Sequence, residues 1–380
     1  MRAHSCLFLA LLVMSALLHG CGESDSAQPR DVVLTADTFR DGKLVLGSPS
    51  LTAGIEGDGP ITDEELNVWL NDPKNHEPLQ VVLPLSLAEE ESSVNIPQDN
   101  PLTRAKIELG RQLFFDQRLS GIGTFSCAVC HRPEQSYSSY QVMPEVERSV
   151  SPVLNRILSQ HQFWDGRAAT LEEQPKSPIS NPFEMNSTPE KSTARIAAIS
   201  GYRLQFERIF GEVSFANICK ALASFERCLV AADSAWDRGE LSAAAKRGEL
   251  LFFSERLGCA DCHPGRNLTD EQFHNLGAHH LVHEQDAGRA KVTSAESDRG
   301  SFKTPTLRNV AVTPPYLHNG AISTLEATID FFDRGGGKVG GSETPLVPLG
   351  LTAEEKQDLI EFLSSLTSEF PPVEQTRLPL

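Results

Sequence analysis

The sequence predicts a mainly α-helical protein in which two related helical domains follow an irregular N-terminal extension. Strand-like alternation is scarce, whereas several segments repeat apolar residues at helical spacing. A ten-residue segment, Gly110 to Leu119, returns as Gly248 to Leu257 with six identical positions. The pattern C-x-x-C-H follows each copy. We interpret this recurrence as an internal duplication, with one small helical domain for each copy.

The two C-x-x-C-H patterns predict two covalently attached c-type haems. In such a site both thiols bond to the haem vinyl groups, and the adjacent histidine ligates the iron. A structural zinc site is the alternative, because zinc also uses paired C-x-x-C. Zinc ribbons keep their pairs about 15–20 residues apart, and zinc would leave both histidines without a role. The expected haem-binding residues are Cys127, Cys130 and His131 in the first domain and Cys259, Cys262 and His263 in the second. Each domain would then be a cytochrome c-like haem domain.

Residues 1–21 predict an export signal with a lipid-attachment site. Arg2 gives a positive start, and Leu7 to Leu18 is nearly all apolar but shorter than the ~20 residues that span a bilayer. The segment ends Leu18-His-Gly-Cys21, which resembles a bacterial lipoprotein cleavage site, although a histidine is unusual at that position. We therefore expect a periplasmic protein anchored through lipid on Cys21, with ordinary secretion as the alternative.

The composition limits the classes of partner. The formal net charge is -17, which argues against nucleic acid because its phosphates would repel the protein. An acidic surface could instead attract a basic redox partner, an effect that salt screens. Hydrophobic and charged contents of 39% and 22% are ordinary for a globular protein.

Residues 22–100 predict an extension that packs on, or spaces, the remainder of the chain. The segment is rich in Gly, Pro, Ser and acidic residues. Thr62-Asp-Glu-Glu65 predicts the start of a short helix through Leu70, and Leu79 to Leu87 is compatible with an extended segment.

Residues 101–238 and 239–380 are the two expected haem domains, with a boundary near Asp233 to Gly239. In the first, Thr103 to Asp116 predicts an amphipathic helix before the haem motif. In the second, Ser323-x-x-Glu326 and Thr352-x-x-Glu355 predict two capped helices. Gly335 to Gly337 should end the earlier of these.

Two further cysteines, Cys219 and Cys228, lie in a stretch with helical apolar spacing. Nine residues along a helix is about 13.5 Å, and a disulfide needs Cα atoms within about 7 Å. We expect two separate core thiols.

Beyond the haem motifs, the chain resembles the bacterial di-haem cytochrome c peroxidase family and its MauG-type relatives from Pro101 to the C-terminus. The matching segments are Phe163-Trp-Asp-Gly-Arg167, Leu171-Glu-Glu-Gln174, Glu184-Met-Asn186, Phe302-Lys-Thr-Pro-Thr-Leu-Arg-Asn309 and Pro315-Tyr-Leu-His-Asn-Gly320. The resemblance implies an enzyme that reduces hydrogen peroxide to water at the N-terminal haem. Electrons would come from an external donor, such as a small cytochrome or a cupredoxin, through the C-terminal haem.

The resemblance also implies roles for three side chains. Trp164 matches the tryptophan between the two haems, although most tryptophans are core aromatics. Glu184 and Gln174 match residues of the peroxide pocket. Glu184 would move a proton between the oxygens of peroxide, and Gln174 would orient peroxide without titrating. The alternative for Glu184 is a solvated surface acid, which is the usual environment of glutamate.

The first departure from the family concerns the N-terminal haem. Members of the peroxidase branch carry a histidine that blocks this iron until reduction, and no histidine occurs here from Arg132 to Gln160. Met143 could ligate, but a flexible packing residue is the commoner role of methionine. We expect the first haem to be five-coordinate when oxidised and ready for peroxide.

The second departure concerns the C-terminal haem, whose second axial ligand is a Met or a Tyr in the family. The matching residue here is Phe332, which cannot bind iron, and every Met lies at or before Met185. His279, His280 and His283 are substitutes, although surface histidines are the commoner explanation. Tyr316 belongs to a shared motif and should pack or hydrogen-bond. The sixth ligand stays open.

The family resemblance further implies a calcium ion between the domains. Thr313 and Pro315 match positions that supply backbone carbonyls. The side-chain ligand of the family falls at Ser149 or Val150, and neither is a strong calcium ligand. Calcium is an open expectation.

Two other functions compete with peroxide reduction. A MauG-like enzyme would use peroxide to oxidise a partner protein; the open first haem favours this branch, and Phe332 in place of its Tyr disfavours it. A plain electron-transfer cytochrome would need neither an open iron nor an acid beside it, so Glu184 and Gln174 argue against that class.

Overall fold

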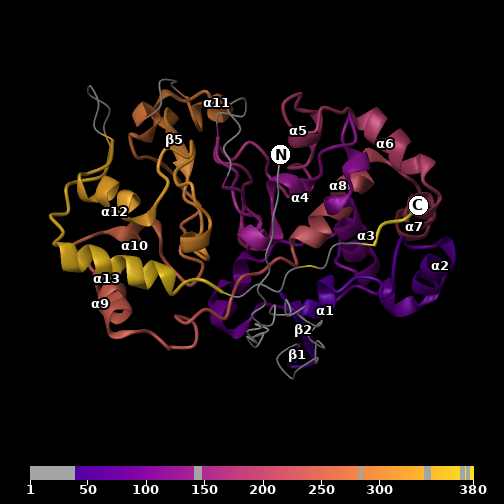
Figure 1. Ribbon diagram of the computed structural model, residues 1–380, viewed down its shortest axis with the longest axis horizontal. Helices are drawn as coiled ribbons and strands as arrows, with labels where there is room; N and C mark the ends of the chain where they lie inside the picture. Colours follow the sequence, from indigo (N-terminus) through magenta and orange to yellow (C-terminus); the bar gives the residue numbers. More distant parts are fainter. Residues whose placement is uncertain (1–38, 141–147, 282–285, 338–343, 369–372, 374–376) are drawn as a thin grey trace, which may run out of the picture. The chain divides into compact units, whose positions relative to one another are not determined.

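The structure, a computed structural model, describes residues 39–140, 148–281, 286–337, 344–368, 373 and 377–380 (Figure 1). The side chains of His279 and His280 are outside this description. The expected export signal with Cys21, and also Met143 and His283, likewise lie outside the described residues. Within the described chain, no helix is both long enough and apolar enough to cross a bilayer.

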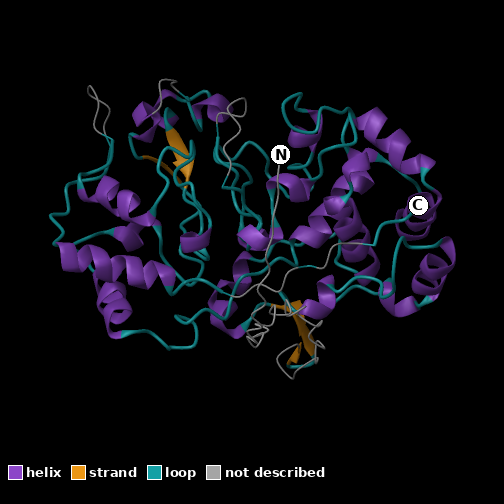
Figure 2. Cartoon of the chain, in the orientation of Figure 1, coloured by secondary structure: helices purple, strands orange, loops and turns teal. Residues whose placement is uncertain are grey.

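The described chain is rich in helices, as predicted, and its strands are short (Figure 2). The helices are α1 (Pro49–Thr52), α2 (Asp63–Asn71), α3 (Arg104–Phe115), α4 (Cys127–Cys130), α5 (Lys176–Ser180), α6 (Pro189–Ala198), α7 (Ser200–Phe210), α8 (Phe215–Glu226), α9 (Ala243–Phe252), α10 (Cys259–Cys262), α11 (Ala290–Thr293), α12 (Leu325–Asp333) and α13 (Ala353–Ser364). The strands are β1 (Phe39–Arg40), β2 (Lys43–Val45), β3 (Val81–Val82), β4 (Phe273–Asn275) and β5 (Ser301–Lys303). In one sheet β2 pairs antiparallel with β1 and parallel with β3, and in the other β4 pairs antiparallel with β5.

Each half of the chain is built on one close pair of helices. Helix α3 packs against α8 in the first half, and α9 packs against α13 in the second (Figure 1). A glycine permits each approach: a Cβ added at Gly110 would overlap the carbonyl oxygen of Ala221, and one at Gly248 would overlap that of Asp358. Any larger residue would push the two helices apart.

Aromatic side chains fill both helix pairs in the same way. The rings of Phe114 and Phe225 lie 5.2 Å apart in the first half, and those of Phe252 and Phe362 lie 5.2 Å apart in the second. In each half the earlier phenylalanine also lies beside the histidine of the haem motif, with Phe114 at 6.5 Å from His131. The corresponding distance from Phe252 to His263 is 6.4 Å. The haem motifs are therefore anchored on equivalent parts of the two cores.

The extension packs on the first half. Its buried leucines join the core that surrounds α3 and α8; they are Leu44, Leu46, Leu51, Leu83 and Leu87. Thr62 and Glu65 form the expected capping box at the start of α2. The predicted extended segment is only partly right, because β3 holds two residues and a 3₁₀ helix follows at Leu85–Ser93.

The predicted helix ends are mostly confirmed. Thr103 caps α3, and Thr352 with Glu355 forms a capping box on α13. The expected box at Ser323 is wrong, because the neighbouring hydroxyl of Thr324 accepts the hydrogen bond from Ala327 and α12 begins one residue later.

Cys219 and Cys228 are separate, buried thiols, as expected. Burial raises the pKa of each to about 12, which keeps both protonated at neutral pH.

Two asparagines with left-handed backbone tie the two halves together. Asn155 (φ 58°) donates to the side chain of Asn267 at 3.1 Å, and its Oδ1 accepts from the amide of Ala231 at 2.7 Å. Asn309 (φ 59°) donates to Ser136 Oγ at 3.1 Å, and its Oδ1 accepts from the amide of Ser368 at 2.9 Å. Each asparagine thus holds the chain that follows the last helix of its own half and contacts the other half.

Candidate active site

Both C-x-x-C-H motifs form a single helical turn followed by a histidine. In α4 and α10 the two cysteines are three residues apart, so both thiols lie on one face of the turn. His131 and His263 cap these turns, and the Nδ1 of each hydrogen-bonds to a backbone carbonyl, that of Tyr137 at 3.1 Å and that of Leu268 at 2.8 Å. A carbonyl accepts only from a protonated nitrogen, so Nε2 keeps the lone pair that a metal requires.

The state of these side chains fits covalent haem. All four motif cysteines are free thiols. Burial lowers the pKa of His131 to about 4 and also lowers that of His263, so both imidazoles are neutral and able to ligate. The residues present therefore fit two c-type haems.

Zinc fits these residues less well. In the part of the chain that the structure describes, the two cysteine pairs do not meet in one cluster. A set of three potential ligands does exist at Cys262, Asp270 and His274. It includes one motif cysteine and neither motif histidine, so it leaves most of the repeated pattern unexplained.

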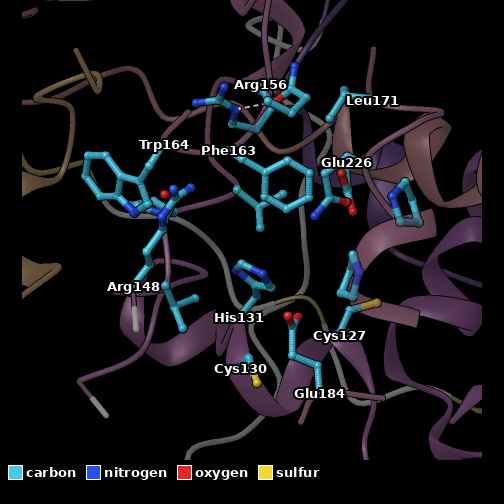
Figure 3. A pocket seen from close by; sticks show the side chains of 18 of the residues that line it. Cys127, Cys130, His131, Arg148, Arg156, Phe163, Trp164, Leu171, Glu184 and Glu226 are labelled. Carbon is cyan, nitrogen blue, oxygen red and sulfur yellow. Dashed lines mark hydrogen bonds between the residues drawn. The ribbon is translucent and has the colours of Figure 1, made fainter. Parts of the chain in front are cut away.

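The first motif opens onto a cavity of about 390 Å³ (Figure 3). Its walls include every site residue predicted for the first haem, namely Cys127, Cys130, His131, Trp164, Gln174 and Glu184. They come from α4, from the loop before α5 and from the turn after it. The structure therefore brings the sequence-predicted residues together around one space.

Glu184 is half-buried on the turn that follows α5. Its Oε1 accepts a hydrogen bond from Asn181 Nδ2 at 2.6 Å, and its carboxylate points into the cavity (Figure 3). Burial raises the pKa of Glu184, although the hydrogen bond from Asn181 opposes that rise. The hydrogen bond from Asn181 fixes Oε1 of Glu184, and Oε2 is left for a ligand in the cavity.

Gln174 lies on the wall of the same cavity. Its backbone amide donates to the carbonyl of Thr170 at 3.2 Å, which fixes the turn that precedes α5. No other described side chain hydrogen-bonds to its amide group, so the amide is available to a ligand.

Trp164 is held by contacts from both halves. Its indole Nε1 donates to the carbonyl of Ser149 at 2.9 Å, and its own carbonyl accepts from the amide of Lys303 on β5 at 2.8 Å. Ser149 in turn donates its amide to the carbonyl of His318 at 2.8 Å. Trp164 therefore joins the wall of the first cavity to the second half.

The second half supplies no sixth ligand at the position that the sequence suggested. Phe332 is half-buried on α12, with its ring 5.4 Å from that of Phe331. Tyr316 donates its hydroxyl to the carbonyl of Val310 at 3.0 Å, as expected of a packing residue, and burial raises its pKa to about 12.

The suggested calcium position is tightly hydrogen-bonded. Ser149 Oγ donates to the carbonyl of Leu317 at 2.8 Å, and the Ser149 carbonyl already accepts from Trp164. Thr313 and Pro315 lie a few residues before Leu317 in the sequence, and the peptide bond before Pro315 is cis. The Thr313 hydroxyl donates to local backbone carbonyls.

Several charged residues in the cavity wall were given no role from the sequence, among them Arg156, Glu226 and Lys303. Lys303 belongs to a motif that carried the family resemblance, and Glu226 interrupts an apolar helix, so both had a sequence signal. Arg156 had none.

Comparison with known proteins agrees with this geometry. A family model described as di-haem cytochrome c peroxidase matches residues 104–246. A methylamine utilization protein MauG from Methylorubrum extorquens is 37% identical over 305 residues, which cover 76% of this chain and 85% of that protein. The chain belongs to the di-haem cytochrome c peroxidase and MauG family.

Peroxidases are among the other relatives in this family. A cytochrome c551 peroxidase from Nitrosomonas europaea is 34% identical over 290 residues, covering 72% of this chain and 83% of that protein. A crystal structure of a MauG-like protein associated with microbial copper homeostasis superposes with a TM-score of 0.67 at 31% identity. The match covers 74% of this chain and 95% of that one. Membership implies two haems and identifies the chain as an oxidoreductase.

Proposed function

We propose that the protein reduces hydrogen peroxide to water at the cavity beside Cys127, Cys130 and His131, with electrons from an external donor. The observation that carries this proposal is that one cavity joins a haem-attachment motif to Glu184, Gln174 and Trp164. Reduction of one peroxide consumes two electrons and two protons and yields two waters. When bound, the haem supplies the iron on which peroxide binds and through which electrons reach it.

Glu184 would move the proton. Its Oε1 is held by Asn181, so Oε2 is free to accept a proton from one oxygen of peroxide and to return it to the other. The amide of Gln174 would hold peroxide in place from the cavity wall. A raised pKa suits such a shuttle, because the carboxyl group then exchanges its proton closer to neutral pH.

Trp164 would carry electrons between the two haem sites. Its ring lines the first cavity, and its carbonyl is bonded to β5 of the second half. His263 would ligate the haem at which electrons enter. A small cytochrome or a cupredoxin is the expected class of donor.

Turnover with a reduced small cytochrome tests the proposal directly. We expect steady oxidation of the donor on addition of peroxide, and a large loss of that rate in Glu184→Gln. Glu212→Gln, an exposed glutamate after α7, is the matched control and should keep the rate. Equal rates in wild type and Glu184→Gln would contradict the role of this carboxyl group.

MauG-like oxidation of a partner protein is the second candidate. Two MauG proteins, at 37% and 36% identity, are among the relatives, and no histidine occurs at 132–160 to block the first iron. This function predicts poor turnover with a small cytochrome donor together with peroxide-dependent oxidation of a protein substrate.

Electron paramagnetic resonance of the oxidised protein tests the open first site. We expect a high-spin signal from the haem at His131 that changes when peroxide is added. A low-spin first haem would mean that a sixth ligand occupies the position that peroxide needs.

We further propose a periplasmic location with lipid on Cys21, and an origin of the two haem domains by duplication. The matching aromatic contacts, glycines and asparagines of the two halves support the second of these. Calcium bound by the carbonyls of Thr313 and Pro315 stays a prediction, to be tested by metal analysis.

A further inference from the structure

The wall of the first cavity carries an unbalanced set of charges. Its cationic side chains are Arg148, Arg156, Arg167, Lys291 and Lys303. Four of them form ion pairs with Asp165, Asp286 or Glu271. Arg156 forms no ion pair with any described residue.

Arg156 bonds only to neutral groups. Its Nε donates to Gln162 Oε1 at 2.9 Å, and its Nη2 donates to the carbonyl of His161 at 3.0 Å. These bonds fix the guanidinium plane and leave Nη1 without a partner in the described chain. Burial lowers the pKa of Arg156, yet a guanidinium stays charged in proteins.

Lys303 shares its surroundings with Arg156. Its side chain is 4% exposed, and its Nζ lies 2.8 Å from Glu271 Oε1. Burial, followed by the positive charge of Arg156, lowers the pKa of Lys303 to about 8. The other oxygen of Glu271 is buried without a hydrogen-bond partner among the described residues. Glu271 therefore pairs with Lys303 and lies near Arg156 without forming an ion pair with it.

Glu226 does not supply the missing negative charge. It is buried in the wall of the same cavity, and burial raises its pKa to about 8 against the opposing charges of Arg227 and Arg156, which favours the neutral carboxyl group. It forms no ion pair with Arg156 or Lys303. A buried charge without a partner costs several kcal/mol, and an anion in the cavity would remove that cost.

The position of Arg156 indicates which anion this is. A c-type haem is bonded to its cysteines along one edge and carries two propionate carboxylates on the opposite edge. Arg156 lies at the end of the cavity away from Cys130 and Glu184 (Figure 3). We propose that Arg156 and Lys303 bind the propionate carboxylates of the haem attached at Cys127 and Cys130. The inference rests on the proposed function, because it requires a haem in this cavity.

The same contact would set the haem beside Trp164. The amide of Lys303 donates to the carbonyl of Trp164 at 2.8 Å, so one residue would hold both the haem edge and the bridging tryptophan. A guanidinium fork matches a carboxylate in two parallel hydrogen bonds, which would fix the orientation of the ring. Arg156 and Lys303 are therefore positioning residues.

The test compares Arg156→Gln with Arg156→Lys in the purified holoprotein. Resonance Raman spectra report the propionate bending bands, and a spectroelectrochemical titration reports the midpoint potential of the first haem. We expect Arg156→Gln to shift the bands and lower the potential, because loss of a nearby positive charge favours ferric over ferrous iron. Arg156→Lys should shift the bands and keep a potential near that of wild type. Lys246→Gln, an exposed cation on α9, should change neither quantity.

Two results would overturn the inference. In the first, Arg156→Gln binds haem with bands and potential like those of wild type. In the second, chloride or inorganic phosphate at constant ionic strength shifts the wild-type potential but not that of Arg156→Gln, which would assign the site to a free anion. If Arg156→Gln fails to take up haem, unchanged bands in Arg156→Lys would overturn the inference as well. Wild-type protein without haem at Cys127 and Cys130 would instead defeat the proposed function.

Discussion

One part-buried hydrogen bond orients Glu184, the side chain that we propose for proton transfer. Asn181 holds Oε1, while burial keeps the proton on the carboxyl group to a higher pH than in water. The geometry and the raised pKa have the same origin, because the turn that aims the carboxylate into the cavity also removes it from solvent.

The pH dependence of catalysis should follow from this shift. As the proton acceptor, Glu184 must be ionised, so kcat/KM for peroxide should rise with pH through a pKa above the ordinary value of 4.5. In Glu184→Gln this rise should vanish and the rate should fall by about 10²–10⁴-fold. Peroxide reduction measured from pH 4 to 8 checks both statements.

The control is Glu212→Gln, which should keep the wild-type profile. A rise that persists unchanged in Glu184→Gln would assign the titration to another group.

The residues that the sequence could reveal were those in contiguous motifs. Cys127 and His131 lie in a pattern whose chemistry depends on local spacing, and Trp164 and Glu184 lie in short segments that carry the family resemblance. Arg156 is different, because the feature that distinguishes it is a buried charge without a carboxylate partner among the described residues. That feature appears only when distant segments fold around one cavity.

At the scale of elements, the two glycine-mediated helix contacts are the most restrictive features. A methyl group at Gly110 or Gly248 would collide with a backbone carbonyl of the facing helix, which cannot move aside as a side chain can. Both glycines lie in the repeated ten-residue segment. The sequence repeat therefore identified these positions, but not the close helix contact that requires glycine there.

Gly110→Ala and Gly248→Ala should each destabilise the protein by about 1–3 kcal/mol. Alanine is by itself the better helix former by about 1 kcal/mol. A net decrease in the free energy of unfolding would therefore have to come from the collision with the facing helix. Chemical denaturation of the holoprotein measures it.

Leu250→Ala, at an exposed position of α9, is the control and should change the free energy of unfolding by less than about 0.5 kcal/mol. Unchanged or increased stability in either glycine variant would show that the helices are not so closely packed.

Helix ends were predictable where one polar group could serve as the cap. Thr62 and Thr352 cap as predicted, and Thr103, the first residue of a predicted helix, also serves as a cap. Ser323 and Thr324 offer two hydroxyls in succession, and the choice between them depends on how α12 buries Leu325 and Ile329. That is a tertiary effect, which a local pattern does not contain.

At the scale of the whole molecule, buried polar contacts join the two haem-binding halves. Asn155 and Asn309 each bond to their own half and to the other one. Both are almost fully buried, so loss of either side chain would leave several backbone and side-chain groups without partners.

Asn155→Ala should therefore lower the thermal midpoint and still leave one cooperative transition that both haem spectra follow together. The expected cost is about 1–3 kcal/mol, the penalty for unsatisfied buried groups. Calorimetry combined with absorbance at both haems checks it. Asn67→Ala, an exposed asparagine on α2, is the matched control. Two separate transitions in the wild type would show that the halves unfold independently.

The double attachment of Trp164 has a consequence for electron tunnelling. The main chain on both sides of the ring is pinned, by the turn from Phe163 to Gly166 and by the amide of Lys303. Under the proposed role of Trp164 in electron transfer, the peptide groups that hold its main chain would keep the side chain in place whichever ring it carries. Trp164→Phe would then change the electronic properties of the ring while the main-chain position stays the same. The variant would therefore report the effect of orbital energy on electron transfer separately from the effect of distance.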